Sequence, residues 1–195
     1  MLDVFRSEEI ATRDDFALLC NWRHLHRAAE IGVDKGLFSE KFLKHWQGHT
    51  YFAVDPWLPY PEMPWGRSAD KAMALEKLFP FTHIVKVIQM ESREFARLFG
   101  EYAIGRFYGY ELDFIYIDGS HEEKEVAADI EAWWPKVSQI GILAGHDYDE
   151  EHPGVIAAVN TFANKNNLSV RTTGEYNPSW YVYKNNPGQD WKRIP

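Results

Sequence analysis

Apolar stretches alternate along this chain with segments whose apolar residues recur at every third or fourth position. The segment 95–102 carries Phe95, Leu98, Phe99 and Tyr102 at the spacing of one helix face, and the other connecting segments follow similar patterns. A strand followed by a helix, repeated five times, predicts an α/β fold with a parallel sheet. The stretches typical of buried strands cover residues 28–33, 50–54, 84–88, 112–117 and 140–144.

The two ends of the chain depart from this alternation. Two β-rich runs, 168–173 and 179–183, follow the last predicted helix, and the short turn between them makes them antiparallel neighbours. Residues 1–26 are mostly polar and predict a helical extension. Residues 56–67 contain four prolines and two tryptophans, which predicts an ordered loop. We expect one domain over residues 1–195.

Composition and charge narrow the class of protein. A chain of 195 residues with 45% apolar content fits a soluble globular domain. With 21 basic against 29 acidic residues and no run of Lys or Arg, neither nucleic acid nor a membrane surface is expected as a partner. The single cysteine, Cys20, lies in an apolar segment and is expected to be buried. No signal-peptide pattern or bilayer-length apolar segment is present, so the expected location is the cytoplasm.

The stretch from Leu112 to Tyr148 carries most of the chemical information. It predicts a strand, a polar turn, an amphipathic helix and a second strand. Asp118 and His121 follow the first strand, and His146 and Asp147 follow the second. Open parallel sheets bind ligands beyond the carboxyl ends of their strands, so we expect these side chains to face one pocket. Two acids there need a cation or hydrogen-bond donors to compensate them.

Two earlier patterns are weaker on their own. Glu30, Gly32 and Gly36 follow the first predicted strand, and the glycines would let a ligand approach the backbone. The spacing is not GxGxxG, which disfavours a dinucleotide cradle. Asp55 follows the second strand, where an acid can accept hydrogen bonds from ribose hydroxyls. It could equally be a solvated turn residue.

Taken together, these patterns resemble the class I S-adenosylmethionine (SAM)-dependent methyltransferases. More narrowly, the chain is similar to the small O-methyltransferase branch that includes macrolide-sugar methyltransferases and cephalosporin-hydroxylase-type proteins. The resemblance implies a Rossmann-like three-layer sandwich whose seven-stranded, mostly parallel sheet has an antiparallel last strand. It is carried between Ala29 and Lys184 by AEIGVDKGLFSEKFL, YFAVDPW, VIQMES, DFIYIDGSHEEKEVAADIEAWWPKVSQIGILAGHDY, GVIAAVNTF and SWYVYK.

The resemblance also implies roles for individual positions. Asp55 would hold the ribose of SAM, and Asp118 would form the floor of the reaction site beside the cofactor. The remaining cofactor-binding positions, from the methionine half to the adenine, would be Glu30, Gly32, Gly36, Met90, Glu91 and Ser92.

In catechol-type and cephalosporin-hydroxylase-type relatives, residues after the fourth and fifth strands bind a divalent cation. The matching positions here are Asp118, His146 and Asp147. A cation such as Mg²⁺ or Mn²⁺ could hold an acceptor hydroxyl and lower its pKa. Histidine at position 146, where an oxygen ligand is more usual, shifts the preference toward Mn²⁺, Fe²⁺ or Zn²⁺. Alternatively, no metal binds and His146 acts as a base.

His121 allows two interpretations. An imidazole can accept a hydroxyl proton near neutral pH, and this position lies near the catalytic lysine of catechol-type relatives. The sequence from Ser120 to Glu123 also has the pattern of a helix N-cap with a capping box, which would make His121 a helix-start residue.

The expected function is SAM-dependent methyl transfer to a hydroxyl of a small molecule, with His121, Asp118 and His146 as catalytic residues. A sugar, a catechol or a natural-product intermediate would suit as acceptor, and loop 56–67 would close over it with Trp57 or Trp65 stacked on its face. A homodimer is compatible with this function. Two alternatives are a methyltransferase-like cofactor-binding protein without turnover and a nicotinamide-dependent reductase, and the missing GxGxxG argues against the second.

Overall fold

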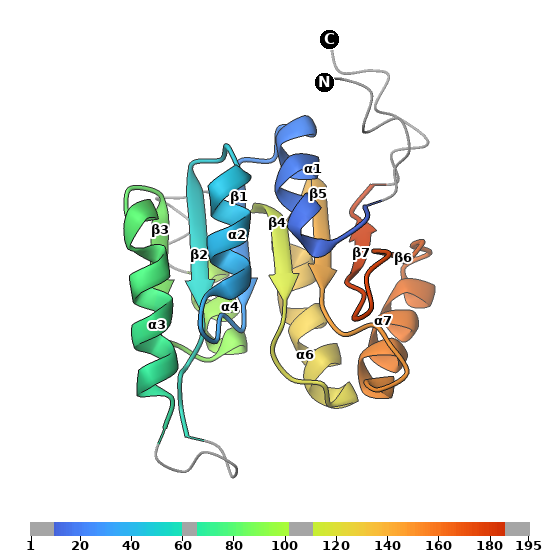
Figure 1. Cartoon of the computed structure of the whole chain (residues 1–195). Coiled ribbons are helices and arrows are strands. Elements are labelled where there is room, and N and C mark those ends of the chain that lie inside the picture. Colours follow the sequence, from blue (N-terminus) through green and yellow to red (C-terminus); the bar gives the residue numbers. More distant parts are fainter. Residues whose placement is uncertain (1–9, 60–65, 102–110, 186–195) are drawn as a thin grey trace.

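The computed structural model describes residues 10–59, 66–101 and 111–185 of the chain. Within these ranges one seven-stranded sheet has the order β3-β2-β1-β4-β5-β7-β6, with helices packed on both faces (Figure 1). No helix in these ranges is long and apolar enough to cross a bilayer. The strands are β1 (Arg27–Ile31), β2 (Thr50–Val54), β3 (Val85–Ile88), β4 (Leu112–Ile117), β5 (Val137–Gly145), β6 (Arg171–Thr172) and β7 (Trp180–Tyr183).

The sheet is parallel from β3 to β5 and antiparallel where β7 pairs with β5 and with β6. This confirms the predicted fold class and the antiparallel end of the sheet. The chain runs outward from β1 through β2 to β3, then returns to the other side of β1 with β4 and β5. The order therefore reverses between β1 and β4, and ligands of such folds bind at this kind of switch point.

Helices cover both faces of the sheet, which explains why the strands are apolar on both sides. The helix α1 and its neighbours α2 and α3 lie over one face, and α4, α6 and α7 lie over the other (Figure 1). Successive residues of β4 alternate between the two cores, with Phe114 and Tyr116 on one face and Ile115 and Ile117 on the other. The helices are α1 (Phe16–Trp22), α2 (Leu37–His45), α3 (Ser68–Leu78), α4 (Ser92–Glu101), α6 (Glu123–Trp133) and α7 (Pro153–Lys165), with short 3-10 turns η1 (Arg13–Asp15), η2 (Phe79–Phe81) and η3 (Trp134–Lys136).

The boundaries of some elements differ from the prediction. The strand expected over 140–144 extends over Val137–Gly145, and the run 168–173 supplies only the two residues of β6. Leu168 is used instead to end α7, because its amide donates to the carbonyl of Ala163. Within the predicted N-terminal extension, the described part consists of η1 and α1, and Cys20 is fully buried in α1 as expected.

The proline- and tryptophan-rich loop begins in the core. Trp57 is only 4% exposed, and its indole nitrogen donates to the carbonyl of Asp34 at 2.9 Å. A side chain in that position packs beside α2 and α3 instead of presenting a face to a ligand, so the stacking role expected of Trp57 does not fit its position. Trp65 and the rest of 60–65 lie outside the described residues, and the closing of this loop stays a prediction.

Only glycine fits at position 32, directly after β1. It has φ +92°, and a Cβ at this position would lie 2.0 Å from the carbonyl oxygen of Asp118. We expect Gly32→Ala to lower the free energy of unfolding by about 2–4 kcal/mol, because left-handed strain adds to a backbone clash. Urea denaturation of this variant would measure the loss.

The matched control is Gly66→Ala. Gly66 also has positive φ (+86°), but among the described residues its Cβ would meet only the side chain of Pro59 at 3.7 Å. This variant carries the backbone strain alone. Equal losses in the two variants would contradict the proposed clash between Gly32 and Asp118.

Candidate functional site

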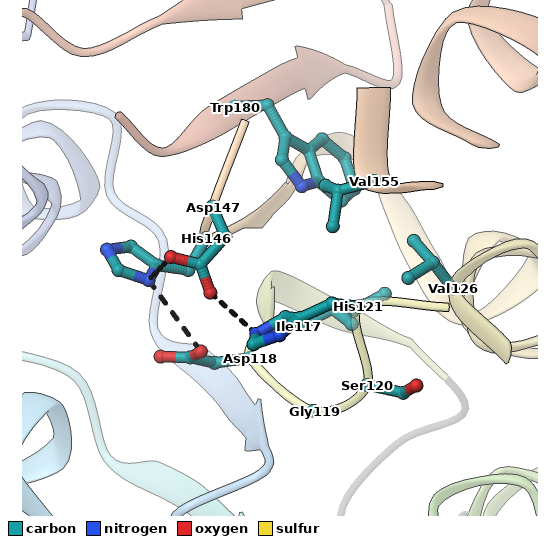
Figure 2. A pocket seen from close by; sticks show the side chains of 10 residues that line it. All are labelled: Ile117, Asp118, Gly119, Ser120, His121, Val126, His146, Asp147, Val155 and Trp180. Atoms are coloured by element: carbon teal, nitrogen blue, oxygen red, sulfur yellow. Dashed lines mark ion pairs between the residues drawn. The ribbon is translucent and has the colours of Figure 1, made fainter. Parts of the chain in front are cut away.

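The carboxyl ends of β4 and β5 bring the predicted acids and imidazoles together. The Nδ1 atom of His146 lies 2.7 Å from Asp147 Oδ1 and 3.8 Å from Asp118 Oδ1, and Asp147 Oδ2 lies 2.8 Å from His121 Nε2 (Figure 2). We refer to these four residues as the acid–imidazole cluster. The amide of His146 donates to the carbonyl of Ile117, so strand pairing itself sets the two strand ends side by side.

The backbone of the cluster is specialised at one position. Asp147 has φ +56°, a left-handed conformation that is uncommon for a residue other than glycine. Conformations of this kind are often retained at functional sites. With its backbone turned this way, Asp147 places one carboxylate oxygen against each histidine, His146 and His121 (Figure 2).

His121 lies in the turn before α6 and not in the helix itself. The helix begins at Glu123 with Glu122 as its N-cap, and Ser120 accepts a hydrogen bond from the amide of Glu122. The predicted capping box from Ser120 to Glu123 is therefore wrong, because the helix starts later than that motif requires. His121 keeps a half-exposed side chain beside Asp147, which agrees with the functional interpretation of this residue.

The charges of the cluster influence one another. Burial raises the pKa of Asp118 above its ordinary value, although His146 and Arg13 act in the opposite direction. Burial would lower the pKa of His146, but its hydrogen bond with Asp147 and the charge of Asp118 outweigh that and raise it. For Asp147, burial is outweighed by the bond with His146, and its pKa is lowered. A charged His146 beside an ionised Asp147 is the favoured pair.

Arg13 reaches this site from η1, far from the other residues in sequence. Its Nη1 atom lies 3.5 Å from Asp118 Oδ2, and its backbone amide donates to Glu175 at 2.7 Å. Burial lowers the pKa of Arg13, but its interactions with Tyr116 and Asp118 outweigh that and raise it. Arg13 could not be identified from the sequence, because nothing in the local pattern of a polar N-terminal segment indicates a contact with β4.

On the cofactor side, Glu30 points into the core. It is 1% exposed, and Ser39 and Tyr51 both donate hydrogen bonds to its carboxyl, the latter at 2.8 Å. Burial raises the pKa of Glu30 to about 8 despite these bonds. The structure therefore places this carboxyl against α2 and β2, while the glycine turn that follows it lies at the strand end.

Asp55 lies at the end of β2 and is nearly fully buried. One oxygen accepts from the amide of Asp34 at 2.9 Å, and the other accepts from the amide of Trp57 at 2.7 Å. Arg67 lies 3.5 Å from the second oxygen and also pairs with Asp34 and, at 3.1 Å, with Asp70. The interpretation of Asp55 as a solvated turn residue is wrong, because the fold surrounds it with donors.

The turn after β3 contributes residues to the same edge. Met90 is partly buried against the core and Glu91 is exposed, while Ser92 accepts a hydrogen bond from the indole of Trp133 at 2.9 Å. The predicted cofactor positions thus follow β3, β2, β1 and β4, which are consecutive neighbours in the sheet. Gly36 begins α2 in a left-handed conformation (φ +73°) and contacts α3 at Ala74.

His152 is a second residue that the sequence analysis missed. It lies directly before α7, its ring centroid is 4.3 Å from that of His121, and its Nδ1 atom is 2.9 Å from Asp149 Oδ1. Its position 31 residues after His121 in the sequence has no recognisable ligand spacing. Only the packing of α7 against α6 brings the two rings together.

Comparison with known proteins identifies the family. Residues 29–148 match a family described as a methyltransferase domain. This span includes all four residues of the acid–imidazole cluster and the predicted cofactor positions. The chain therefore belongs to this family of methyltransferase domains, and its resemblance to the class I SAM-dependent methyltransferases is confirmed. No curated protein matches the sequence.

Solved structures share the fold at low sequence identity. An O-methyltransferase from Bacillus cereus in complex with S-adenosylhomocysteine (SAH) has a TM-score of 0.64 at 12% identity, over 88% of this chain and 80% of its own. TomG, an O-methyltransferase of tomaymycin synthesis from Streptomyces achromogenes in complex with SAM, has a TM-score of 0.63 at 11% identity, over 88% and 78%. Spermidine synthase from Thermotoga maritima has a TM-score of 0.56 at 14% identity, over 83% and 53%. Proteins that share this fold can transfer different groups, so the fold alone does not identify the acceptor. The acceptor has to be inferred from the residues of the site.

Glu30 gives the site a measurable pH dependence. Its pKa is about 8 in the folded protein, whereas an unfolded glutamate ionises near about 4.3. Between these values the unfolded chain releases the proton first, so folding stability falls as pH rises, by at most about 1.4 kcal/mol per pH unit. Glu30→Gln removes this titration, and we expect the stability of wild type relative to the variant to decline steadily from pH 5 to pH 8.

Urea denaturation at several pH values would measure this difference, with Glu76→Gln on the exposed side of α3 as the control. The Glu76 variant should follow wild type at every pH. If the curves of wild type and Glu30→Gln stay parallel, Glu30 does not carry a proton in the folded protein.

Proposed function

We propose that this protein transfers the methyl group of SAM to a hydroxyl of a small molecule. Family membership supports methyl transfer, and the acid–imidazole cluster supports a hydroxyl as the acceptor. A hydroxyl must lose its proton when it is methylated, and carboxylates and imidazoles are the groups that accept such protons. The cluster lies at the ends of β4 and β5, and its residue Asp118 adjoins the switch point between β1 and β4, where ligands of such folds bind.

The residues present at this edge fit SAM, whose chemical contribution is a methyl group on a positively charged sulfur. Asp118 makes the surroundings of the methionine half acidic, which favours a sulfonium and an ammonium group. Because the carboxyl of Glu30 is bonded to Ser39 and Tyr51, we expect Glu30 to act by fixing the glycine turn. Asp55 retains acceptor capacity beyond its two backbone bonds, since a carboxylate offers about four lone-pair sites, and a ribose hydroxyl can add to them.

The guanidinium of Arg13 supplies a positive charge for the methionine half of the cofactor. The methionine part of SAM carries a carboxylate, which a charged Asp118 would repel. Arg13 lies beside Asp118, and its charge also acts on Glu30, so it stands between the two strand ends that flank this half of the cofactor. A guanidinium pairs with a carboxylate through two parallel hydrogen bonds, which would orient the cofactor as well as hold it.

A divalent cation fits the residues predicted for it. One ligand atom from each of Asp118, His146 and Asp147 lies within 4.8 Å of the others. Two carboxylates with one imidazole suit Mn²⁺ as well as Mg²⁺. A cation held there would polarise the acceptor hydroxyl. Without one, His146 and Asp118 would position the hydroxyl directly by hydrogen bonds.

For the base we favour His121. Its side chain is half exposed, so an acceptor can reach it, whereas that of His146 is 14% exposed. Asp147 engages the Nε2 atom of His121, which orients the ring and leaves Nδ1 to accept the proton. Asp147 would then stabilise the charged imidazole. His146 is the alternative base where no cation binds it, but it must first lose the proton that its pairing with Asp147 favours.

The first test is calorimetric titration with SAH, with and without Mg²⁺ or Mn²⁺, followed by assay of Asp118→Asn on sugars and catechols. We expect micromolar SAH binding in wild type, and a loss of turnover of about 100-fold or more in a folded variant, because the group that positions the acceptor is gone. Full activity of the variant would refute the role of Asp118. The surface variant His83→Ala is the control.

The same titration separates the alternatives. Cofactor binding without turnover on any hydroxylated acceptor would favour the cofactor-binding protein. Absence of SAH binding in every condition would remove the proposed methyl transfer, and binding of NADH in its place would favour the reductase.

The proposed role of Arg13 is tested by comparing two ligands, one with the carboxylate and one without it. We expect Arg13→Met to weaken SAH binding about 10-fold, which corresponds to about 1.4 kcal/mol for the lost charge pair. Binding of 5′-methylthioadenosine, which lacks the carboxylate, should stay unchanged in the same variant. Equal losses for the two ligands would mean that Arg13 acts on the fold of the site and not on the carboxylate.

A further inference from the structure

We propose that His121, Asp147 and His152 form a second cation site, suited to Zn²⁺ or a similar borderline metal ion. His121 lies beside Asp147 Oδ2, the carboxylate oxygen that does not contact His146, and His152 packs against His121. This inference does not depend on methyl transfer, because it concerns the binding of a metal ion alone.

The geometry brings three ligands of the right kind together. One ligand atom from each of the three residues lies within 4.8 Å of the others, so a single cation could contact all of them after small side-chain movements. His121 Nε2 and Asp147 Oδ2 are 2.8 Å apart, and the centroids of the two imidazole rings are 4.3 Å apart. Two imidazoles with one carboxylate form a set that Zn²⁺ and Fe²⁺ use in proteins.

The ring of His152 is already oriented for such a role. Asp149 Oδ1 lies 2.9 Å from its Nδ1 atom and also accepts from its backbone amide at 3.1 Å. This leaves Nε2 as the nitrogen for a metal ion. Metal-binding histidines in proteins almost always have their other nitrogen held by a carboxylate, a carbonyl or a water molecule. Asp149 thus has the position of an outer-shell partner.

The fold itself maintains the contact between the two histidines. Gly154, in the first turn of α7, lies so close to the turn before α6 that a Cβ there would be 2.4 Å from the carbonyl oxygen of His121. Only glycine allows this approach of α7, and the approach sets His152 against His121. The pairing is therefore part of the packing between α6 and α7, not a chance encounter of surface side chains.

Asp147 is shared between the two sets of ligands. Its Oδ1 atom faces His146 and its Oδ2 atom faces His121, so one carboxylate can serve a cation on each side. Shared carboxylates are common where two metal ions act together. The two sets differ in character, because the first has two carboxylates and one imidazole, and the second has the reverse.

Occupation of the second site has a consequence for the proposed base. A neutral imidazole that binds a metal ion through Nε2 carries its own proton on Nδ1, so Nδ1 of His121 could no longer accept the proton of the acceptor. A bound Zn²⁺ would therefore suppress any reaction that uses His121 as the base. Removal of His152 would relieve that suppression, since His152 itself is outside the proposed catalytic group.

The experiment is equilibrium dialysis of the full chain against Zn²⁺ alone, after treatment with a chelator. We expect His152→Ala to weaken the tightest Zn²⁺ binding at least 10-fold, and Asp149→Asn to weaken it about 10- to 100-fold, as for other outer-shell partners. His146→Ala belongs only to the first set and should retain this binding. His83→Ala, on the exposed turn before β3, is the matched control for the loss of a histidine.

Unfolding temperatures and SAH titrations of the same variants complete the test. Zn²⁺ binding that is lost in His152→Ala but kept in His146→Ala, in folded proteins, supports the second site whether or not SAH binds. The proposal is overturned if wild type binds no Zn²⁺, if His152→Ala leaves the tightest binding unchanged, or if only His146→Ala removes it. Failure of SAH binding alone would count against the proposed function and not against this site.

Discussion

The pairing of β1 with β4 is the constraint on which the rest of the site depends. The amide of Asp118 donates to the carbonyl of Ile31 at 2.7 Å, and the backbone of Asp118 lies where the side chain of any other residue at Gly32 would be. The strand order reverses at this pair of parallel strands. Because of that close contact, the glycine turn after β1 lies against the acid after β4, and the other predicted site residues lie on either side of this pair.

The protein compensates its buried acids with partners from distant parts of the chain. Asp118 contacts Arg13 and His146, Asp147 contacts two histidines, and Asp55 is bonded to backbone amides and lies near Arg67. Unpaired carboxylates in such positions would cost several kcal/mol each. The cluster can therefore exist in a folded protein before any ligand binds, and a cofactor or cation would exchange partners with groups that are already positioned. Glu30 is the exception, since it avoids the cost by keeping its proton.

The arrangement around Asp147 connects the two proposals. One carboxylate orients both candidate bases, and its two oxygens face two sets of cation ligands that differ in their preference between hard and borderline ions. Which ion binds would decide whether His121 remains available for proton transfer. A single residue in a left-handed conformation thus links the proposed acceptor activation to the start of α7, an element that contains none of the predicted cofactor positions.

The strands, their burial and the acids and imidazoles at their carboxyl ends could be predicted from the sequence, because periodicity and turn residues encode which face each side chain occupies. The capping box predicted at Ser120 is wrong, because the hydroxyl of Ser120 accepts from the amide of Glu122 in a short turn and the helix begins only at Glu123. Three contacts could not be predicted, because they depend on how distant elements pack: Arg13 meets Asp118, Arg67 lies near Asp55, and His152 meets His121. The two residues of each pair are separated in the sequence by an interval that matches neither helix nor strand periodicity. Their contacts form only once the strand order and the packing of α7 against α6 are fixed.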